Sequence, residues 1–403
     1  MLSLLSLALP TAVLAKDPAA DPGFERSPIQ GAVDPAVLPL GVDDTRSVTV
    51  MLQLADKPIA VRTADAGRVL TRAEEQAAKA QLKGTQDGLR GQIAAHGGTV
   101  LAELQWAYNG IKVRIARKNV AALAALPNVV AVRGIQLQTP GNETSVPFLG
   151  VPGDVWEDLG RTGDGVKIAV IDTGFDYTHA NFGGPGTVAA YNAANAADTT
   201  LGPEDAAWFG PNAPKVKGGF DFVGDAYDAA ADDGSPALVP HPDPDPLDCV
   251  YTDGSSGHGS HVSGTATGFG VLADGSTYRG PYDSSTYDND FLVGPGVAPE
   301  ADLYGLRVFG CDGSTDVTTE AIEWAVENHM DVINMSLGSV FGRSDDPSAV
   351  ASTNAAAAGV VVVTSAGNNG PSPYITGSPG AATGAIATAA VDSTQSFIGV
   401  RLA

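Results

Sequence analysis

The chain has 403 residues, 43% of them hydrophobic, so it is long and apolar enough for two or three domains with cores of their own. Its formal net charge is −23. Nucleic acids and anionic membranes repel such an acidic surface, which argues against both as partners. The only two cysteines, Cys249 and Cys311, most simply form one disulfide in an exported chain, and the alternative is two unpaired thiols.

Residues 1–15 have the pattern of a signal peptide. The stretch is apolar and offers small residues, Val13 and Ala15, before a cleavage point after Ala15, although it has no Lys or Arg at its start. It is too short to span a bilayer, and no later run of 18 apolar residues exists. We therefore expect a secreted protein with no membrane anchor in this chain. Residues 16–46 are rich in Pro, Asp, Gly and Ala without periodicity, which is typical of a linker.

Residues 47–137 are predicted to form a compact α+β domain. Strand-like alternation, an Ala- and Gln-rich helical stretch and the Asn109-Gly110 turn between two apolar runs are its main signals. The expected elements are a strand at 47–54, a helix at 72–96, strands at 99–108 and 110–116, a helix at 117–127 and a strand at 128–134. This βαββαβ order is the ferredoxin-like arrangement.

Residues 138–403 change to an α/β pattern. Their apolar runs are nearly continuous, as in strands that are buried on both faces, and helical periodicity lies between the runs. We expect strands at 166–172, 301–309, 331–337, 359–365 and 384–391, and helices at 315–329 and 348–359. Such alternation predicts a parallel sheet flanked by helices. The polar stretch 182–254 is expected to form surface loops with one short strand at 218–224.

Three polar motifs follow the predicted strands. Asp172 ends the strand 166–172, and His258 opens a small-residue helix in the segment GHGSHVSGTATG. Asn368 follows the strand 359–365 in SAGNNG, where its side-chain amide can donate to a developing oxyanion. Functional groups collect at the carboxyl ends of strands in such sheets, and histidine is the usual general base. The alternative is ordinary helix-capping and turn chemistry for Asp172 and Asn368.

Two further features belong with these motifs. The backbone of Ser336, Leu337 and Gly338, at the end of another strand, can pair with an extended peptide. His261 lies one helical turn from His258, but no third ligand motif accompanies the pair, so we expect no zinc site and take His261 as a packed neighbour of the base.

The order of these motifs resembles the subtilase family, the subtilisin-like serine peptidases. The matching segments are VIDTG around Asp172, GHGSHVSGT around His258, DVINMSLG and SAGNNG. The resemblance implies a subtilisin-like catalytic domain over 138–403, incomplete at its end, and an inhibitor I9-type propeptide over 47–137. It further implies a secreted endopeptidase precursor that needs no cofactor, acts on proteins or peptides and is inhibited by its own propeptide, with processing between about Gly134 and Val146.

The resemblance also implies roles for individual residues. Asp172 would orient His258, His258 would take the proton of a serine hydroxyl, and Asn368 would stabilise the oxyanion. Ser336, Leu337 and Gly338 would line the extended substrate near its P1 pocket. A disulfide between Cys249 and Cys311 would tie the long segment before His258 to the sheet.

The chain departs from the family pattern in one respect, because it contains no Gly-Thr-Ser segment for the nucleophilic serine. A truncated gene or gene model, a deliberate fragment and a natural pseudoprotease that binds peptides are the alternatives. The 403 residues by themselves are expected to be inactive by the triad route. The acidic segment 241–249 offers oxygen atoms that suit calcium, but without the spacing of a known calcium loop, so a solvated loop is expected there.

Overall fold

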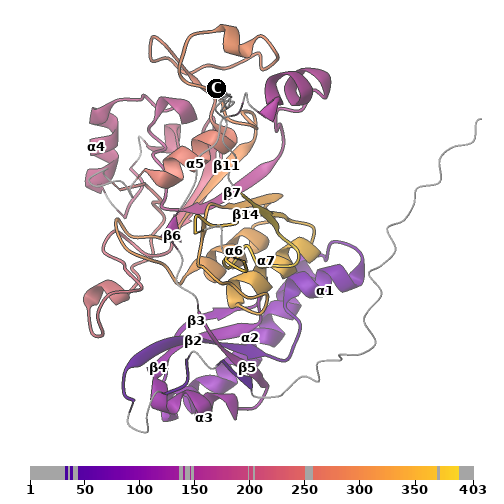
Figure 1. The fold of residues 1–403 in the computed structure, drawn as a ribbon, viewed down its shortest axis with the longest axis vertical. Coiled ribbons are helices and arrows are strands. Elements are labelled where there is room, and N and C mark those ends of the chain that lie inside the picture. The colour runs from indigo at the N-terminus through magenta and orange to yellow at the C-terminus, as the bar shows by residue number, and fades with distance from the viewer. Residues whose placement is uncertain are drawn as a thin grey trace, which may run out of the picture.

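The computed structural model describes residues 32–34, 37–39, 44–135, 139–140, 146, 149–197, 199–202, 205–249, 257–369 and 373–389. The predicted signal peptide 1–15 lies outside this range, as does most of the predicted linker 16–46. Two units pack against each other: an N-terminal one with a mostly antiparallel sheet and a larger one with a parallel sheet (Figure 1). Within the described part, no helix combines the length and the apolar character needed to cross a membrane.

The N-terminal unit contains a sheet with the strand order β1-β5-β2-β4-β3. Its strands are β1 (Ala32–Val33), β2 (Ser47–Leu54), β3 (Thr99–Leu104), β4 (Gly110–Ala116) and β5 (Val129–Gly134). The four strands from β5 to β3 are antiparallel, in the order that a ferredoxin-like βαββαβ unit requires, so the predicted arrangement is confirmed. β1 pairs in parallel with β5, although it comes from the segment expected to be a linker without regular structure.

The helices of this unit are α1 (Ile59–Ala66), α2 (Arg72–Ala95) and α3 (Val120–Ala124), with a 3-10 turn at Arg117–Asn119. α2 begins with a capping box, in which the Thr71 hydroxyl accepts from the Glu74 amide and the Glu74 carboxylate accepts from the Thr71 amide. Its apolar face points at the sheet, and Leu82, Leu89 and Ile93 are buried. The sequence did not predict α1, a helix of only two turns that starts directly after Pro58.

β3 ends four residues earlier than predicted. The backbone amides of residues 105–108 do not continue the sheet, because they donate to the Glu323 carboxylate of the second unit. That carboxylate accepts four amides, including Ala107 at 2.6 Å and Tyr108 at 3.3 Å. These amides thus bond to Glu323, which is distant in sequence, instead of to a neighbouring strand. An alternation pattern in the sequence could not reveal this.

The second unit is built on six strands in the order β15-β14-β12-β7-β11-β8. They are β7 (Lys167–Asp172), β8 (Val216–Asp221), β11 (Asp302–Arg307), β12 (Val332–Met335), β14 (Val361–Ser365) and β15 (Ile386–Thr388). Every pair of neighbours is parallel, as the α/β pattern predicted. All carboxyl ends of these strands therefore lie along one edge of the sheet.

Helices cover both faces of this sheet. The longer ones are α4 (Val188–Ala197), α5 (His258–Thr267), α6 (Thr318–Glu327) and α7 (Pro347–Ala357), and a π-helix spans Val151–Asp158. Successive side chains of β7 point to opposite faces. Ala169 and Ile171 join the core that contains residues of α6 and α7, whereas Ile168 and Val170 join the core that contains Val262 of α5. Burial on both faces explains the unbroken apolar run of β7.

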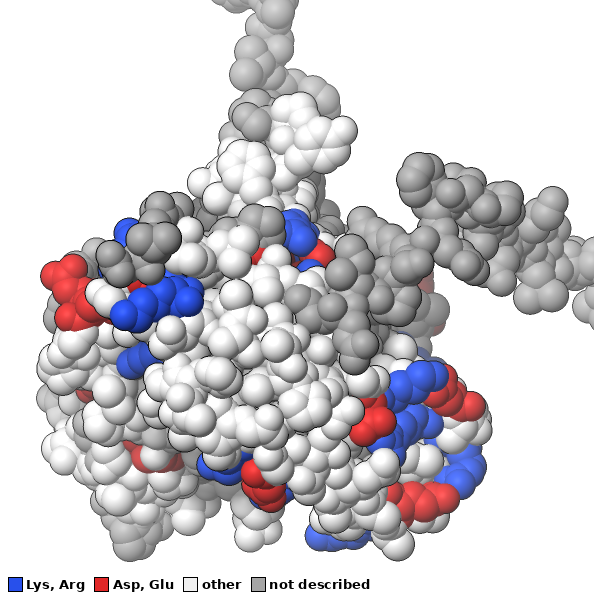
Figure 2. Space-filling model, turned by 90° about the horizontal axis from the view of Figure 1, so that it is seen from below, with Lys and Arg blue, Asp and Glu red and all other residues white. Residues whose placement is uncertain are grey.

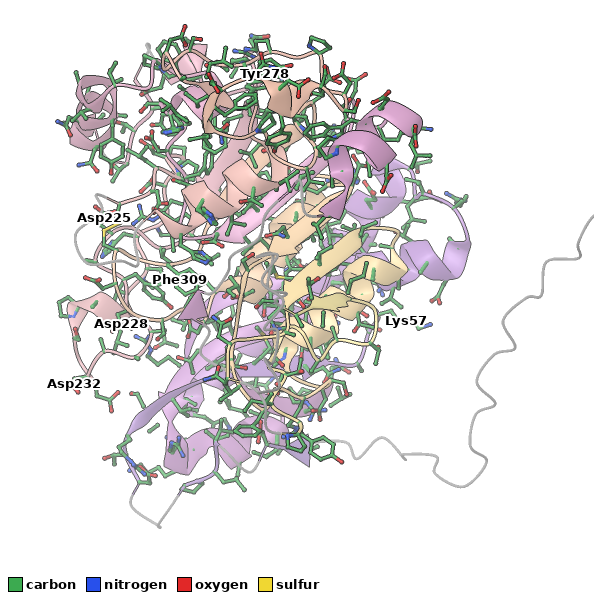
Figure 3. The ribbon with its side chains drawn as sticks, turned by 45° about the horizontal axis from the view of Figure 1, so that its top comes forward. Lys57, Asp225, Asp228, Asp232, Tyr278 and Phe309 are labelled. Atoms are coloured by element: carbon green, nitrogen blue, oxygen red, sulfur yellow. A yellow bond between two sulfur atoms is a disulfide. The ribbon has the colours of Figure 1, made fainter. Side chains whose placement is uncertain are left out.

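Three features of this unit differ from the predicted elements. The segment 182–254, expected to be loops with one strand, also contains α4, whose only buried residue is Ala194, so it lacks an apolar stripe. Asp225, Asp228 and Asp232 lie along one side of the molecule in this segment (Figure 3). The strand predicted at 331–337 is divided at Ser336 into β12 and a short strand, β13 (Leu337–Gly338). A hairpin of β9 (Val271–Leu272) and β10 (Phe291–Val293) was not predicted.

The two units share one hydrophobic core. Met51, Leu82 and Trp106 of the first unit belong to the same cluster as Ile322 and Ala351 of the second. Figure 1 shows α6 and α7 lying between the parallel sheet and the N-terminal unit, with α1 beside α7. On the face seen in Figure 2, basic and acidic side chains lie next to one another around a broad area without charges, so the net charge of −23 is not gathered on this side.

A buried ion cluster joins the units as well. Lys112 of β4 lies 2.9 Å from carboxylate oxygens of both Asp316 and Glu320, and its side chain is only 3% exposed. The Tyr227 hydroxyl donates to the same oxygen of Asp316. Burial alone would lower the pKa of Lys112, but the two carboxylates outweigh that effect and raise it. The lysine is therefore held in its charged form.

Replacing Lys112 with Ala would leave two buried acidic groups without their cation. We expect Lys112→Ala to lower the free energy of unfolding by about 3–5 kcal/mol, as is typical when one partner of a buried ion pair is removed. Lys57→Ala is the control, because Lys57 pairs with Asp65 at 2.7 Å on the surface, and we expect it to cost less than about 1 kcal/mol. Urea unfolding followed by tryptophan fluorescence measures both; equal midpoints for the two variants would contradict the assignment.

Candidate active site

The parallel sheet and α5 bring two of the predicted site residues together. Asp172 is the last residue of β7, and His258 is the first residue of α5. The N-cap residue just before α5 is Gly257, whose φ of +85° is a left-handed conformation that suits glycine. α5 can lie close to the strand end because Gly259 has no side chain: an added Cβ there would be 1.9 Å from the carbonyl oxygen of Gly174.

The Asp172 carboxylate and the His258 ring are hydrogen-bonded. Asp172 Oδ1 lies 2.7 Å from His258 Nδ1 and also accepts from the Thr173 amide at 2.8 Å. An acceptor carboxylate at Nδ1 favours the tautomer with its proton there, which leaves a lone pair on Nε2. Nε2 is buried and has no hydrogen-bond partner within the described ranges. The ring can therefore accept a proton at Nε2 while Asp172 holds its other side.

The electrostatics of His258 suit a base. Burial alone would lower its pKa, but the hydrogen bond and charge of Asp172, together with the charge of Asp248, outweigh that effect and raise the pKa above the ordinary value. Asp172 is 1% exposed, so its charge acts through little water. The imidazolium that forms on proton uptake is stabilised by these neighbours.

The predicted substrate segment lies at the edge of a groove. A cavity of about 380 Å³ extends over β7, β12 and β14 to α5, and Ser336 and Asn368 both line it. Leu337 and Gly338 form β13, which pairs antiparallel with β6 (Thr139–Pro140). A segment that precedes the parallel sheet in the chain thus occupies the edge of the 336–338 segment.

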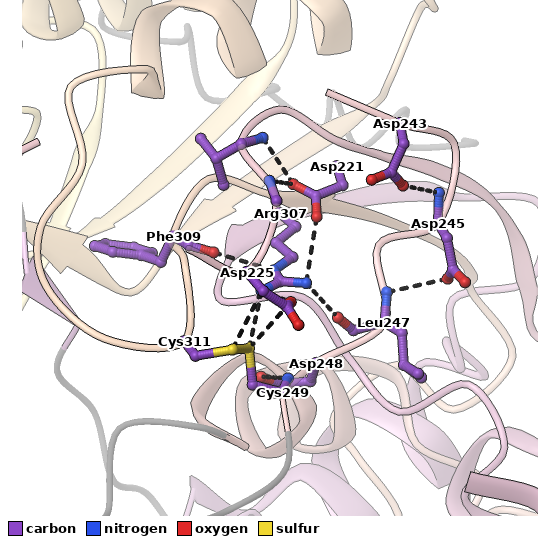
Figure 4. A network of polar contacts seen from close by, with 12 residues as sticks. Asp221, Asp225, Asp243, Asp245, Leu247, Asp248, Cys249, Arg307, Phe309 and Cys311 are labelled. Atoms are coloured by element: carbon purple, nitrogen blue, oxygen red, sulfur yellow. Dashed lines mark hydrogen bonds and ion pairs between the residues drawn. A yellow bond between two sulfur atoms is a disulfide. The ribbon is translucent and has the colours of Figure 1, made fainter. Parts of the chain in front are cut away.

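The predicted disulfide residues are adjacent in space. The structure joins Cys249, nine positions before the start of α5, to Cys311, four positions after the end of β11 (Figure 4). Asp225 and these two sulfur atoms are the only group of three potential metal ligands among the described residues, and the bond between the sulfurs removes both thiolates from such a set.

One expectation about this region holds only in part, and another is wrong. In the segment 241–249, expected to be a solvated loop, residues 241, 242 and 244 are exposed. Residues 245–249 are buried, and carboxylates there accept amides of the same loop, such as Leu247 at Asp245 and Cys249 at Asp248. His261, one helical turn further along α5, is exposed and is therefore not a packed neighbour of His258.

Sequence reasoning missed Arg307 and Glu323. Arg307 is 2% exposed and ends β11, where the only signal is a cation inside an apolar run. Glu323 is buried on α6 and receives the amides of residues 105–108. Charged residues are rarely buried without a partner. A charged residue at a position expected to be apolar was therefore the only sign in the sequence that each side chain has a specific partner.

Comparison with known proteins agrees with this geometry. The model of the subtilase family (Peptidase S8) matches residues 163–398. The chain belongs to the subtilase family. Both the predicted family and the predicted α/β fold are thus confirmed.

Individual relatives cover the chain to different extents. The minor extracellular protease Vpr of Bacillus subtilis (strain 168) is 27% identical over 389 residues, which are 91% of this chain and 38% of that protein. Subtilisin E of the same strain is 28% identical over 254 residues, which are 62% of this chain and 47% of that protein. The chain thus spans less than half the length of these two relatives.

One solved structure is also similar. Fervidolysin of Fervidobacterium pennivorans, described as a keratinolytic enzyme related to subtilisin, aligns with a TM-score of 0.44 and 18% sequence identity. The alignment covers 85% of this chain and 42% of that chain.

The Asp172–His258 pair makes the titration of His258 a direct test of the site. In Asp172→Asn the charge of residue 172 is lost, so we expect the pKa of His258 to fall below its wild-type value. NMR titration of the ring measures it, with the other histidines as internal controls.

The same shift predicts how stability depends on pH. Because the folded-state pKa of His258 is raised, its contribution is complete below the unfolded value of about 6.5 and is lost as the pH rises through the folded value. The difference in unfolding free energy between wild type and Asp172→Asn should therefore be larger at acid pH than at alkaline pH. A difference that grows with pH would contradict the pairing.

Proposed function

We propose that this chain is the N-terminal part of a secreted subtilisin-like endopeptidase precursor. The observation that carries the proposal is the hydrogen bond of 2.7 Å between His258 Nδ1 and Asp172 Oδ1, combined with a buried Nε2 that has no partner in the described part of the chain. Nε2 is where a serine hydroxyl would give up its proton. The proposed reaction is hydrolysis of peptide bonds in proteins.

His258 would act as general base and then as general acid. It would take the proton of a serine hydroxyl at Nε2 and return it to the leaving amine. Asp172 would hold the tautomer and stabilise the imidazolium without taking up the proton itself. Asn368, at the rim of the groove, would donate its side-chain amide to the oxyanion of the tetrahedral intermediate.

Residues 336–338 would bind the substrate as an added strand. The antiparallel pairing of β13 with β6 supports this role, since an extended segment already uses this edge in the same manner.

Residues 47–137 would be the inhibitory propeptide. Glu323 and the Lys112 cluster attach this unit to the parallel-sheet unit, and β6 lies just beyond it in the chain, at the proposed substrate edge. The segment from Gly134 to Val146, which includes β6, would be the processing region. Extracellular relatives such as the minor extracellular protease Vpr support secretion and, with it, an oxidised Cys249–Cys311 pair.

The processing site is testable by N-terminal sequencing of the active, full-length protein. We expect a new N-terminus between residues 134 and 146, because cleavage there separates the propeptide from the parallel-sheet unit. Sequencing the protein before and after activation provides the control. A mature protein that begins upstream of Asp43 would contradict the propeptide assignment.

The nucleophile is the second test. The 403 residues contain no Gly-Thr-Ser segment, so this chain alone should neither hydrolyse casein nor react with a fluorophosphonate. The DNA that follows codon 403 decides the matter. If the reading frame continues into such a segment, its product should hydrolyse casein, and His258→Ala should lower kcat by on the order of 10⁴ or more.

Two outcomes would overturn the proposed activity. One is a genuine stop codon after codon 403 in an expressed gene, which would favour a catalytically inactive protein that binds peptides at residues 336–338. The other is a product with the serine segment whose activity survives His258→Ala. An exposed residue on the same helix, His261, offers the control substitution His261→Ala, which should leave kcat nearly unchanged.

A further inference from the structure

The first turn of α5 is held by a residue outside the helix. The N-cap residue Gly257 has no side chain to accept the amides that the first turn leaves without helical partners. Asp248 supplies that acceptor: its Oδ2 atom lies 3.2 Å from the Ser260 amide and 3.0 Å from the Ser260 hydroxyl. Asp248 is 2% exposed and comes from the loop ten positions before His258.

Ser260 links Asp248 to the segment that follows Asp172. Its hydroxyl donates to Asp248 and accepts from the Asp176 amide at 2.8 Å. One residue earlier in the helix, the Gly259 amide donates to the Thr173 hydroxyl at 2.8 Å. The first turn of α5 is thus attached at two points to the segment that directly follows Asp172.

Asp248 is itself fixed on both sides by Arg307. In the sheet register Arg307 stands beside Asp172 on the neighbouring strand β11. Its guanidinium donates to the Leu247 carbonyl at 3.0 Å and to Cys249 Sγ at 2.8 Å, the residues immediately before and after Asp248 (Figure 4). The backbone of Asp248 therefore has a defined position relative to Asp172.

Other contacts hold the guanidinium in turn. Arg307 forms ion pairs with Asp221 at 3.2 Å and with Asp225 at 2.7 Å, and its Nε donates to the Phe309 carbonyl at 3.0 Å (Figure 4). A buried guanidinium with its donors satisfied in this way is rigid, since moving it would leave a buried charge without partners. The disulfide from Cys249 to Cys311 also ties the loop that carries Asp248 to the segment after β11.

We propose that Asp248 is a positioning residue for His258, and that Arg307 fixes Asp248. In this arrangement Asp248 and Ser260 hold the start of α5 against the end of β7, so that the His258 ring stays within hydrogen-bonding distance of Asp172. The inference rests on the proposed function, because it assigns a second buried carboxylate to the same base. A carboxylate is also favourable at a helix N-terminus, where the helix dipole is positive.

The alternative is that Asp248 merely stabilises α5 or acts through its charge alone. The rate at which the His258 Nδ1 proton exchanges with water separates these cases, because it reports how often the hydrogen bond to Asp172 opens. Titration of the His258 ring reports the charge. Both are measured by NMR on the complete 403-residue chain and need no catalytic activity.

Three variants at residues 248 and 260 form the core of the experiment. Asp248→Ala removes the acceptor and the charge, and we expect about tenfold faster exchange of the Nδ1 proton, as fits the loss of a helix cap. Asp248→Asn keeps an acceptor oxygen without the charge, so exchange should stay within about twofold of wild type while the pKa of His258 falls. Ser260→Ala cuts the link but keeps the charge, and should speed exchange with little change in pKa.

Asp274→Ala is the matched control. Asp274 accepts from the amide and the hydroxyl of Ser276 at 2.9 and 2.6 Å, the same pair of contacts as Asp248 with Ser260, but on an exposed turn. It should change neither measurement. Positioning is overturned if Asp248→Ala and Ser260→Ala leave the exchange rate unchanged, or if Asp274→Ala raises it equally. If Asp248→Ala does not fold, Ser260→Ala and Asp248→Asn still decide.

Asp172→Asn separates this inference from the proposed function. If Asp172→Asn changes neither exchange nor the titration of His258, the pairing itself is wrong and the proposed function fails with it. If Asp172→Asn changes both measurements while the variants at residues 248 and 260 leave the exchange rate unchanged, only the positioning role is wrong.

Discussion

The parallel pairing of β7 with β11 is the constraint on which the rest of the structure depends. It places Asp172 and Arg307 side by side at the carboxyl edge of the sheet, one with a buried negative charge and the other with a buried positive charge. Each charge needs partners, because neither is stable alone in a low-dielectric interior. Asp172 is hydrogen-bonded to His258. Arg307 forms ion pairs with Asp221 and Asp225 and donates hydrogen bonds to the loop that carries Asp248.

Successive side chains of β7 point to opposite faces of the sheet, and each face packs against different helices. Ile168 and Val170 pack with α5, which carries His258, while Ala169 and Ile171 pack with α6 and α7, which face the N-terminal unit. The site and the interface with the N-terminal unit are therefore built on opposite sides of the same strand. The sheet between them is held rigidly, because both its faces are buried.

The interface combines a shared apolar core with a few buried polar contacts. Glu323 receives four amides of a segment that would otherwise have continued β3, and Lys112 fills the space between two carboxylates. Such contacts add little net stability compared with apolar burial, but they define one relative position of the units, since any other leaves charges unpaired. That role fits the propeptide function proposed for the N-terminal unit.

The sequence alone determined the family, the two sheet types and the residues Asp172 and His258, because periodicity and short motifs are local properties. It also indicated the βαββαβ order of the N-terminal unit. It could not show that Asp172 and His258, 86 positions apart, are hydrogen-bonded at 2.7 Å, nor that residues 105–108 leave the sheet for Glu323. It took the whole segment 241–249 as solvated, although residues 245–249 are buried, and it took the exposed His261 as packed. The pairing of Asp172 with His258 and the contacts of Glu323 were decided by the tertiary structure, because each depends on a partner that is far away in the chain and is brought close only by the fold.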